Sequence, residues 1–63
     1  MAEKMLKYYK YMQDTLGLDG KMALARETKI PSTQAALERD TPETIQRFKV
    51  AVTKITQKPA PEF

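Results

Sequence analysis

Cysteine, histidine and tryptophan are absent from this 63-residue chain, and Ser32 is its single serine. The lack of cysteine excludes disulfides, and the lack of both cysteine and histidine leaves only carboxylates for a zinc site, which is an unusual ligand set. The Ser–His and Cys–His pairs of common hydrolases cannot form either. We therefore predict a protein that is not an enzyme and that uses no metal, no cofactor and no small-molecule substrate.

The remaining polar groups do not replace those missing residues. Glu27, Glu38 and Glu43 have basic neighbours, as is typical of a solvated surface. No two carboxylates share an apolar setting that would separate their pKa values for acid–base catalysis. The two glycines, Gly17 and Gly20, match no phosphate-binding loop. These patterns favour binding over catalysis as the class of function.

Long apolar runs are also missing. No stretch approaches the ~20 apolar residues of a membrane span, and lysines interrupt the N-terminal region where a signal peptide would be apolar. The absence of cysteine fits a reducing compartment. We therefore predict a cytoplasmic protein with no membrane partner. The formal net charge of +3 is compatible with nucleic acid but does not require it.

The length of the chain limits its stability. A domain of this size buries only about 60% of the surface that its unfolded chain exposes, so the core contributes little net free energy. Small scaffolds are usually reinforced by disulfides, metals or association, and the composition argues against the first two. We therefore expect association with a second copy of the chain or with another protein.

The first half of the chain predicts two helices. Residues 2–16 carry an apolar stripe at spacings of four, three and four, formed by Met5, Tyr9, Met12 and Leu16. Gly17 can adopt the left-handed conformation that commonly ends a helix. Asp19 is the expected N-cap of a second helix, which continues to about residue 28 because Pro31 disfavours helix at the residue before it.

The second half predicts a short helix, a long helix and a tail. Ser32 is the expected cap of residues 33–39, and Thr41 of residues 42–57, where Pro42 occupies the first position. The long helix has an apolar stripe formed by Ile45, Phe48, Val52 and Ile55. We place its basic residues on the far, solvated face: Arg47, Lys54 and Lys58.

Together these elements predict an all-α fold, a small bundle of three to four helices joined by short turns. The first and last helices form the main core together with Leu24 and Leu37. Residues 1–57 form the single domain, and residues 58–63 form an extended, mobile, proline-rich tail.

Six residues are candidates for a protein interface. Methionine suits adaptable contact surfaces, tyrosine is common at interfaces, and Val50 lies off the apolar stripe of its helix. The candidates are Met5, Tyr8, Tyr11, Met12, Met22 and Val50.

The order of features also resembles the helix-turn-helix domains of the lambda-repressor and Cro family. Gly17, Leu18 and Asp19 look like the residues that separate the first two helices of that fold, and Lys29 stands where the family has a turn glycine. Residues 24–32 are similar to its second helix and turn, and residues 37–39 to the end of its recognition helix. The resemblance implies DNA binding through Ser32, Thr33, Gln34 and Arg39.

Two functions therefore remain open from the sequence. The first is a non-enzymatic helical binding or regulatory module that associates with a protein partner or with itself, and hence a homo-oligomer. The alternative is a helix-turn-helix DNA-binding regulator of transcription, for which the same residues 32–39 would enter the major groove.

Overall fold

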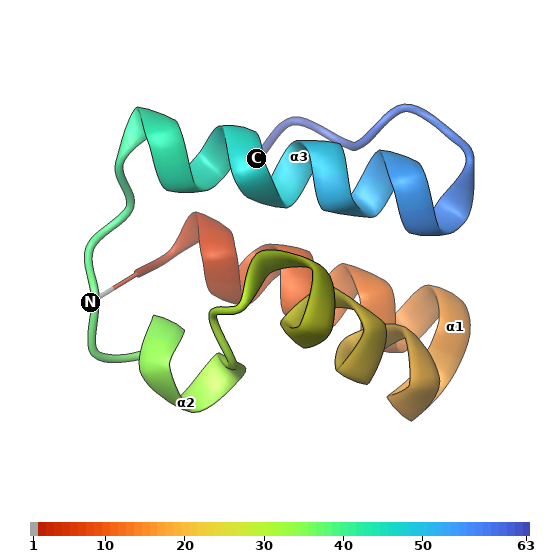
Figure 1. Ribbon diagram of the computed structural model, residues 1–63, viewed down its shortest axis with the longest axis horizontal. Helices are drawn as coiled ribbons and strands as arrows, with labels where there is room; N and C mark the ends of the chain where they lie inside the picture. Colours follow the sequence, from red (N-terminus) through yellow and green to blue (C-terminus); the bar gives the residue numbers. More distant parts are fainter. Residues whose placement is uncertain (1) are drawn as a thin grey trace.

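The computed structural model describes residues 2–63 and contains three helices in that range: α1 (Lys4–Thr28), α2 (Ser32–Ala35) and α3 (Pro42–Thr56) (Figure 1). Residues 2–63 include no strand. The predicted all-α class is thereby confirmed. None of the helices in this range combines the length and the apolar character needed to cross a membrane.

Gly17 divides α1 into two parts, which we call the first arm (residues 4–16) and the second arm (residues 18–28). Its φ of 72° and ψ of −157° are not helical, and glycine reaches them at little cost. The chain therefore reverses along the long axis of the molecule at this point (Figure 1). The predicted helix end at Gly17 is confirmed, but helix resumes at Leu18, so Asp19 lies inside the second arm and is not its N-cap.

Gly20 allows the two arms to approach each other closely. A Cβ atom at this position would lie 2.7 Å from the Cβ of Leu16 and 2.7 Å from the carbonyl oxygen of Met12. Atoms do not pack at such distances, so any side chain here would push the arms apart. Nothing in the sequence around Gly20 predicts this contact, because it joins two segments that only the Gly17 turn brings together.

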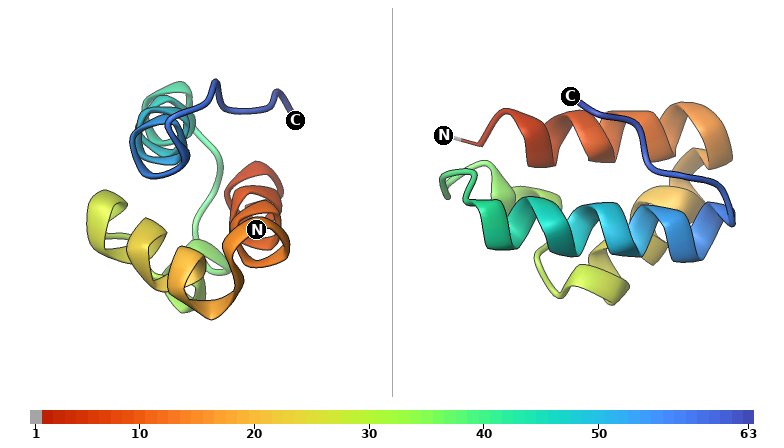
Figure 2. Two further views of the ribbon diagram at one scale, coloured as in Figure 1. Left: turned by 90° about the vertical axis from the view of Figure 1, so that its right-hand side faces the viewer. Right: turned by 90° about the horizontal axis from the view of Figure 1, so that it is seen from above.

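The core lies between the first arm, the second arm and α3, which surround it in the end-on view (Figure 2, left). The ring of Phe48 lies 5.7 Å from that of Tyr9 and 6.3 Å from that of Tyr8, measured between centroids. The buried apolar residues are Ala2, Met5, Tyr8, Tyr9, Met12, Leu24, Ile30, Ala35, Phe48, Ala51 and Val52. Ile45 and Ile55 pack against them while partly exposed.

Two leucines predicted to belong to the core are exposed instead. Leu37 is 86% exposed, because α2 ends at Ala35 after one turn and the chain moves away from the core once Ala35 is buried. Leu16 is 46% exposed, because it lies next to the Gly17 turn at the edge of the bundle. The predicted burial of Leu24 is confirmed.

The region of residues 32–39 is less helical than predicted. Only Ser32–Ala35 forms a helix, and Ser32 is its first residue, not its cap; the N-cap is Pro31 and offers no side-chain hydrogen bond. Turn hydrogen bonds follow, from the Leu37 amide to the Gln34 carbonyl (3.0 Å) and from the Glu38 amide to the Ala35 carbonyl (3.3 Å).

The start of α3 agrees with the prediction. The Thr41 hydroxyl accepts a hydrogen bond from the Thr44 amide (3.1 Å), and the Thr44 hydroxyl accepts one from the Thr41 amide (3.0 Å). This is a capping box, and Pro42 follows at the first position of the helix.

The start of α1 is capped by a residue distant in sequence. The Asp40 carboxylate accepts hydrogen bonds from the backbone amides of Glu3 (3.0 Å), Lys4 (2.8 Å) and Met5 (3.2 Å). Partial burial by itself would raise the pKa of Asp40, but these three amides and the nearby Lys4 charge outweigh it and lower the pKa. Asp40 therefore ties the first arm to the segment before α3.

The C-terminal end of α1 is also held by distant residues. Lys29 has a φ of 60°, and its amide bonds to the Ala25 carbonyl (2.8 Å). The Tyr9 hydroxyl donates to the Ile30 carbonyl, and the Arg47 guanidinium donates to the Thr28 carbonyl. These bonds satisfy backbone acceptors that a helix end would otherwise leave unpaired.

The basic residues Arg47, Lys54 and Lys58 are exposed to solvent, as predicted, but the first two also contact α1. Arg47 reaches the end of α1, and Lys54 pairs with Glu27 of the second arm at 3.4 Å. Both side chains therefore point along the α1–α3 contact, because the second arm packs beside α3 on that side.

Candidate interaction surfaces

The tail, residues 58–63, leaves α3 at Gln57, whose φ of 58° reverses the chain. It then runs back beside α3 and crosses toward the first arm (Figure 2). The segment forms neither helix nor strand. We call the surface that it covers the tail groove, defined by Tyr8 and Tyr11 of the first arm and Lys49 of α3.

Three kinds of contact hold the tail in this groove. The Tyr8 hydroxyl donates a hydrogen bond to the Pro61 carbonyl (2.7 Å). The Phe63 ring meets Tyr8 edge-on, with centroids 4.9 Å apart, and lies 6.4 Å from Tyr11. The Lys49 ammonium pairs with the Glu62 carboxylate at 2.7 Å. The mobility of residues 58–63 remains a prediction. Movement of the tail out of the groove would break these three contacts.

The electrostatics of the tail groove reflect these contacts. Burial raises the pKa of the Tyr8 phenol, the Lys49 charge opposes that rise, and the Glu62 charge adds to it. The hydrogen bond to Glu62 raises the pKa of Lys49. Tyr8 therefore stays a neutral hydrogen-bond donor, and Lys49 stays a cation, throughout the physiological pH range.

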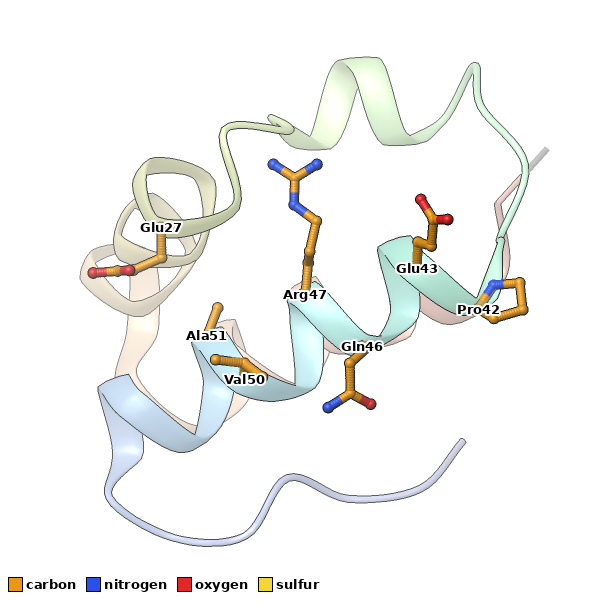
Figure 3. Close-up of a pocket in the computed structure, with 7 residues that line it drawn as sticks. All are labelled: Glu27, Pro42, Glu43, Gln46, Arg47, Val50 and Ala51. Carbon is orange, nitrogen blue, oxygen red and sulfur yellow. The ribbon is translucent and has the colours of Figure 1, made fainter.

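Apart from the tail groove, a hollow of about 600 Å³ lies between the second arm and α3 and is drawn in Figure 3. Val50 and Ala51 form an apolar part of its wall, and the Arg47 side chain extends past them toward the loop after α1 (Figure 3). The lining residues are Glu27, Pro42, Glu43, Gln46, Arg47, Val50 and Ala51. Two of its charged groups are already engaged, since Arg47 bonds to Thr28 and Glu27 pairs with Lys54.

An exposed apolar surface surrounds the turn at Gly17, and we call it the corner patch. It consists of Leu16, Leu18 and Met22, which are 46%, 65% and 50% exposed. Leu18 and Met22 are four residues apart on one helix, so their side chains are neighbours. Leu16 and Leu18 flank the glycine itself. Three large apolar residues around the Gly17 turn are thus exposed to solvent.

The six interface candidates from the sequence separate into two groups. Met5, Tyr8 and Met12 are completely buried: Met5 and Met12 lie in the core, and Tyr8 lies partly beneath the tail, so a partner reaches Tyr8 only when the tail is displaced. The spacing placed Met5 and Met12 on the apolar stripe, and only the tertiary packing shows that both are covered whereas Leu16, at the end of the stripe, is exposed. Two other candidates, Met22 and Val50, are exposed, and Tyr11 is half-buried beside Phe63.

The candidate DNA-contacting residues are mostly on the surface. Thr33, Gln34 and Arg39 are exposed, and Ser32 is half-buried. The Gln34 amide donates to the Glu38 carboxylate (3.0 Å), which engages one of the two N–H donors with which Gln34 would read a base. Glu38 and Asp40 flank Arg39 with negative charge.

Other kinds of site are not assembled in the described part of the chain. Among residues 2–63, no three acidic side chains come together as a metal site would need, and every buried side-chain nitrogen or oxygen has a hydrogen-bond partner. Comparison with protein-family models, with characterised proteins and with solved structures finds no match for this chain. Any functional assignment therefore depends on the surfaces described above.

Proposed function

We propose that this chain is a non-enzymatic protein-association module, cytoplasmic in location, that associates with a second copy of itself through the corner patch. The observation that carries the proposal is the exposure of three large apolar residues around one turn, Leu16, Leu18 and Met22, on a chain with a small core. Contiguous apolar surface of this kind commonly marks an interface.

Symmetric self-association suits a patch of this form. In a two-fold dimer the same patch faces itself, so each leucine of one copy meets an apolar residue of the other. The exposed Asp19 carboxylate and the half-buried Lys21 stem lie beside the patch in sequence. They have opposite charges, and this suits the polar rim around the apolar centre of an interface.

The test is the solution mass of the protein by light scattering over a concentration series. We expect the mass to rise from monomer toward dimer, and Leu18→Lys to shift the midpoint to concentrations at least about tenfold higher, the ratio that corresponds to ~1.4 kcal/mol. Leu37→Lys is the matched control, because Leu37 is more exposed than Leu18 and lies after α2, at the opposite end of the long axis (Figure 1).

A monomer mass over the whole series would contradict this proposal. Equal effects of Leu18→Lys and Leu37→Lys would also contradict it, because that result would show a general effect of added charge. Melting temperature as a function of protein concentration gives an independent measure, since association with the folded state raises it.

DNA binding is the second candidate function. It is favoured by the exposure of Thr33, Gln34 and Arg39 on the turn that follows the second arm. It is disfavoured by the single helical turn of α2 and by the carboxylates beside Arg39. Retention on duplex DNA that weakens steeply with salt, and that Arg39→Ala reduces, would support this function. Retention unchanged by Arg39→Ala would reject these residues as the contact.

A further inference from the structure

We propose that the tail groove is a peptide-binding site. Its partner is an extended peptide in which a proline is followed by an acidic residue and then by an aromatic residue. The chain's own Pro61, Glu62 and Phe63 show how such a peptide is held. This inference concerns a different surface from the corner patch and does not depend on self-association.

Each contact of the tail selects one feature of the peptide. The Tyr8 hydroxyl binds the carbonyl of the proline, Lys49 binds the carboxylate, and the edges of Tyr8 and Tyr11 receive the aromatic ring. Proline keeps the peptide extended before it binds, so little conformational entropy is lost. Aromatic grooves that bind proline-containing peptides in other proteins use the same principle.

The groove is larger than the tail that lies in it. A hollow of about 420 Å³ separates α3 from the start of the tail at Pro59 and Ala60. A second hollow, of about 200 Å³, lies beside Phe63 and is lined by Lys7, Lys10, Tyr11 and Asp14. A separate peptide has additional space beside α3 and beside the aromatic ring, where the two lysines favour acidic neighbours.

The tail is held loosely enough to be displaced. The Glu62 side chain is 79% exposed, so its ion pair with Lys49 is weakened by solvent, and Phe63 is 39% exposed. The tail therefore competes with a separate peptide for the same groove. A separate peptide binds with its intrinsic affinity multiplied by the fraction of molecules whose groove is open.

The experiment measures the anisotropy of a fluorescein-labelled peptide, Lys-Pro-Ala-Pro-Glu-Phe, titrated with the full chain. The unmodified chain is compared with the double variant Glu62→Ala and Phe63→Ala, which keeps the groove but weakens the tail. We expect the double variant to bind at least about tenfold more tightly, because its groove is open in a larger fraction of molecules. Circular dichroism of both proteins verifies that the helices are intact.

A charge reversal assigns the binding to this groove. In the double variant, Lys49→Glu should weaken binding of the peptide by about fivefold, the upper range for an exposed ion pair, and should favour the reversed peptide Lys-Pro-Ala-Pro-Lys-Phe over it. Lys54→Glu is the control, because Lys54 is also on α3 but pairs with Glu27 of the second arm. It should leave the affinity within about twofold, since exposed charges distant from the peptide are largely screened.

The proposal would be overturned if the double variant did not bind the peptide at any attainable concentration. It would also be overturned if the double variant and the unmodified chain bound the peptide equally well, or if Lys49→Glu and Lys54→Glu had equal effects. A dimer of the unmodified chain that disappears in the double variant would also overturn it, because it would assign the groove to the tail of a second copy. Leu18→Lys tests the corner patch separately, so the two proposals can fail independently.

Discussion

The two long helices begin in different ways. The start of α3 is capped by Thr41 and Thr44, three residues apart, whereas the start of α1 is capped by Asp40, which lies 35 to 37 residues from the amides that it binds. The first cap forms within one helical turn, so it needs only the local chain. The second forms only after the first arm, the second arm and α2 have been arranged. The unpaired backbone amides at the start of a helix are thus satisfied by a nearby side chain in α3 and by a tertiary contact in α1.

The largest effect should come from removing the distant cap. Asp40→Ala leaves three amides without their acceptor, and we expect it to lower the free energy of unfolding by about 2 kcal/mol, the upper part of the range for helix caps. Urea denaturation followed by circular dichroism measures this change. A loss no greater than that of Thr41→Ala would show that water replaces Asp40 at the exposed end of α1.

A smaller effect is expected from the local cap. Thr41→Ala removes the side-chain partner of the Thr44 amide, at a cost of about 1 kcal/mol. Thr41→Ser keeps the hydroxyl and serves as the control. Because this cap is local, we also expect a synthetic peptide of residues 40–57 to lose helix content on the same substitution, which circular dichroism of the peptide would detect. An unchanged helix content would mean that this cap, too, needs the rest of the fold.

The pH dependence of stability distinguishes the two caps further. Folding lowers the pKa of Asp40, so its contribution is fully present above the ordinary aspartate pKa of about 3.9 and is lost as the pH falls through the lower, folded value. Asp40→Asn lacks this dependence. The stability difference between the unmodified chain and Asp40→Asn should therefore shrink toward acid pH, whereas the difference between the unmodified chain and Thr41→Ala should not. Denaturation at a series of pH values measures both differences.

The smallest effect is expected at the tail, and it tests whether sequence separation by itself makes a contact strong. Lys49 and Glu62 are 13 residues apart, but both are accessible to solvent. Glu62→Gln should change the denaturation midpoint less than either cap substitution, because screening weakens exposed ion pairs. A loss as large as that of Asp40→Ala would show that the tail is part of the cooperative fold.

The candidate interaction surfaces were harder to predict than the helices. The methionine and tyrosine content predicted an interaction surface formed by these residue types. However, Met5, Tyr8 and Met12 are in the core, whereas Leu16 and Leu18 are exposed. Periodicity shows which residues share a helix face and does not show how far a neighbouring helix covers that face. The tail groove had no sequence signal beyond a proline-rich end, because its contacts with Tyr8 and Tyr11 join residues from opposite ends of the chain.

The sequence by itself determined the helices of the two arms and of α3, the break at Gly17 and the capped start at Thr41, since each depends on residues within a few positions of one another. Only the tertiary structure decided that Asp40 caps the first helix, that Gly20 must lack a side chain, that Leu37 is exposed and that the tail covers Tyr8. These features depend on the path of the chain between distant residues, and local conformational preferences do not specify that path.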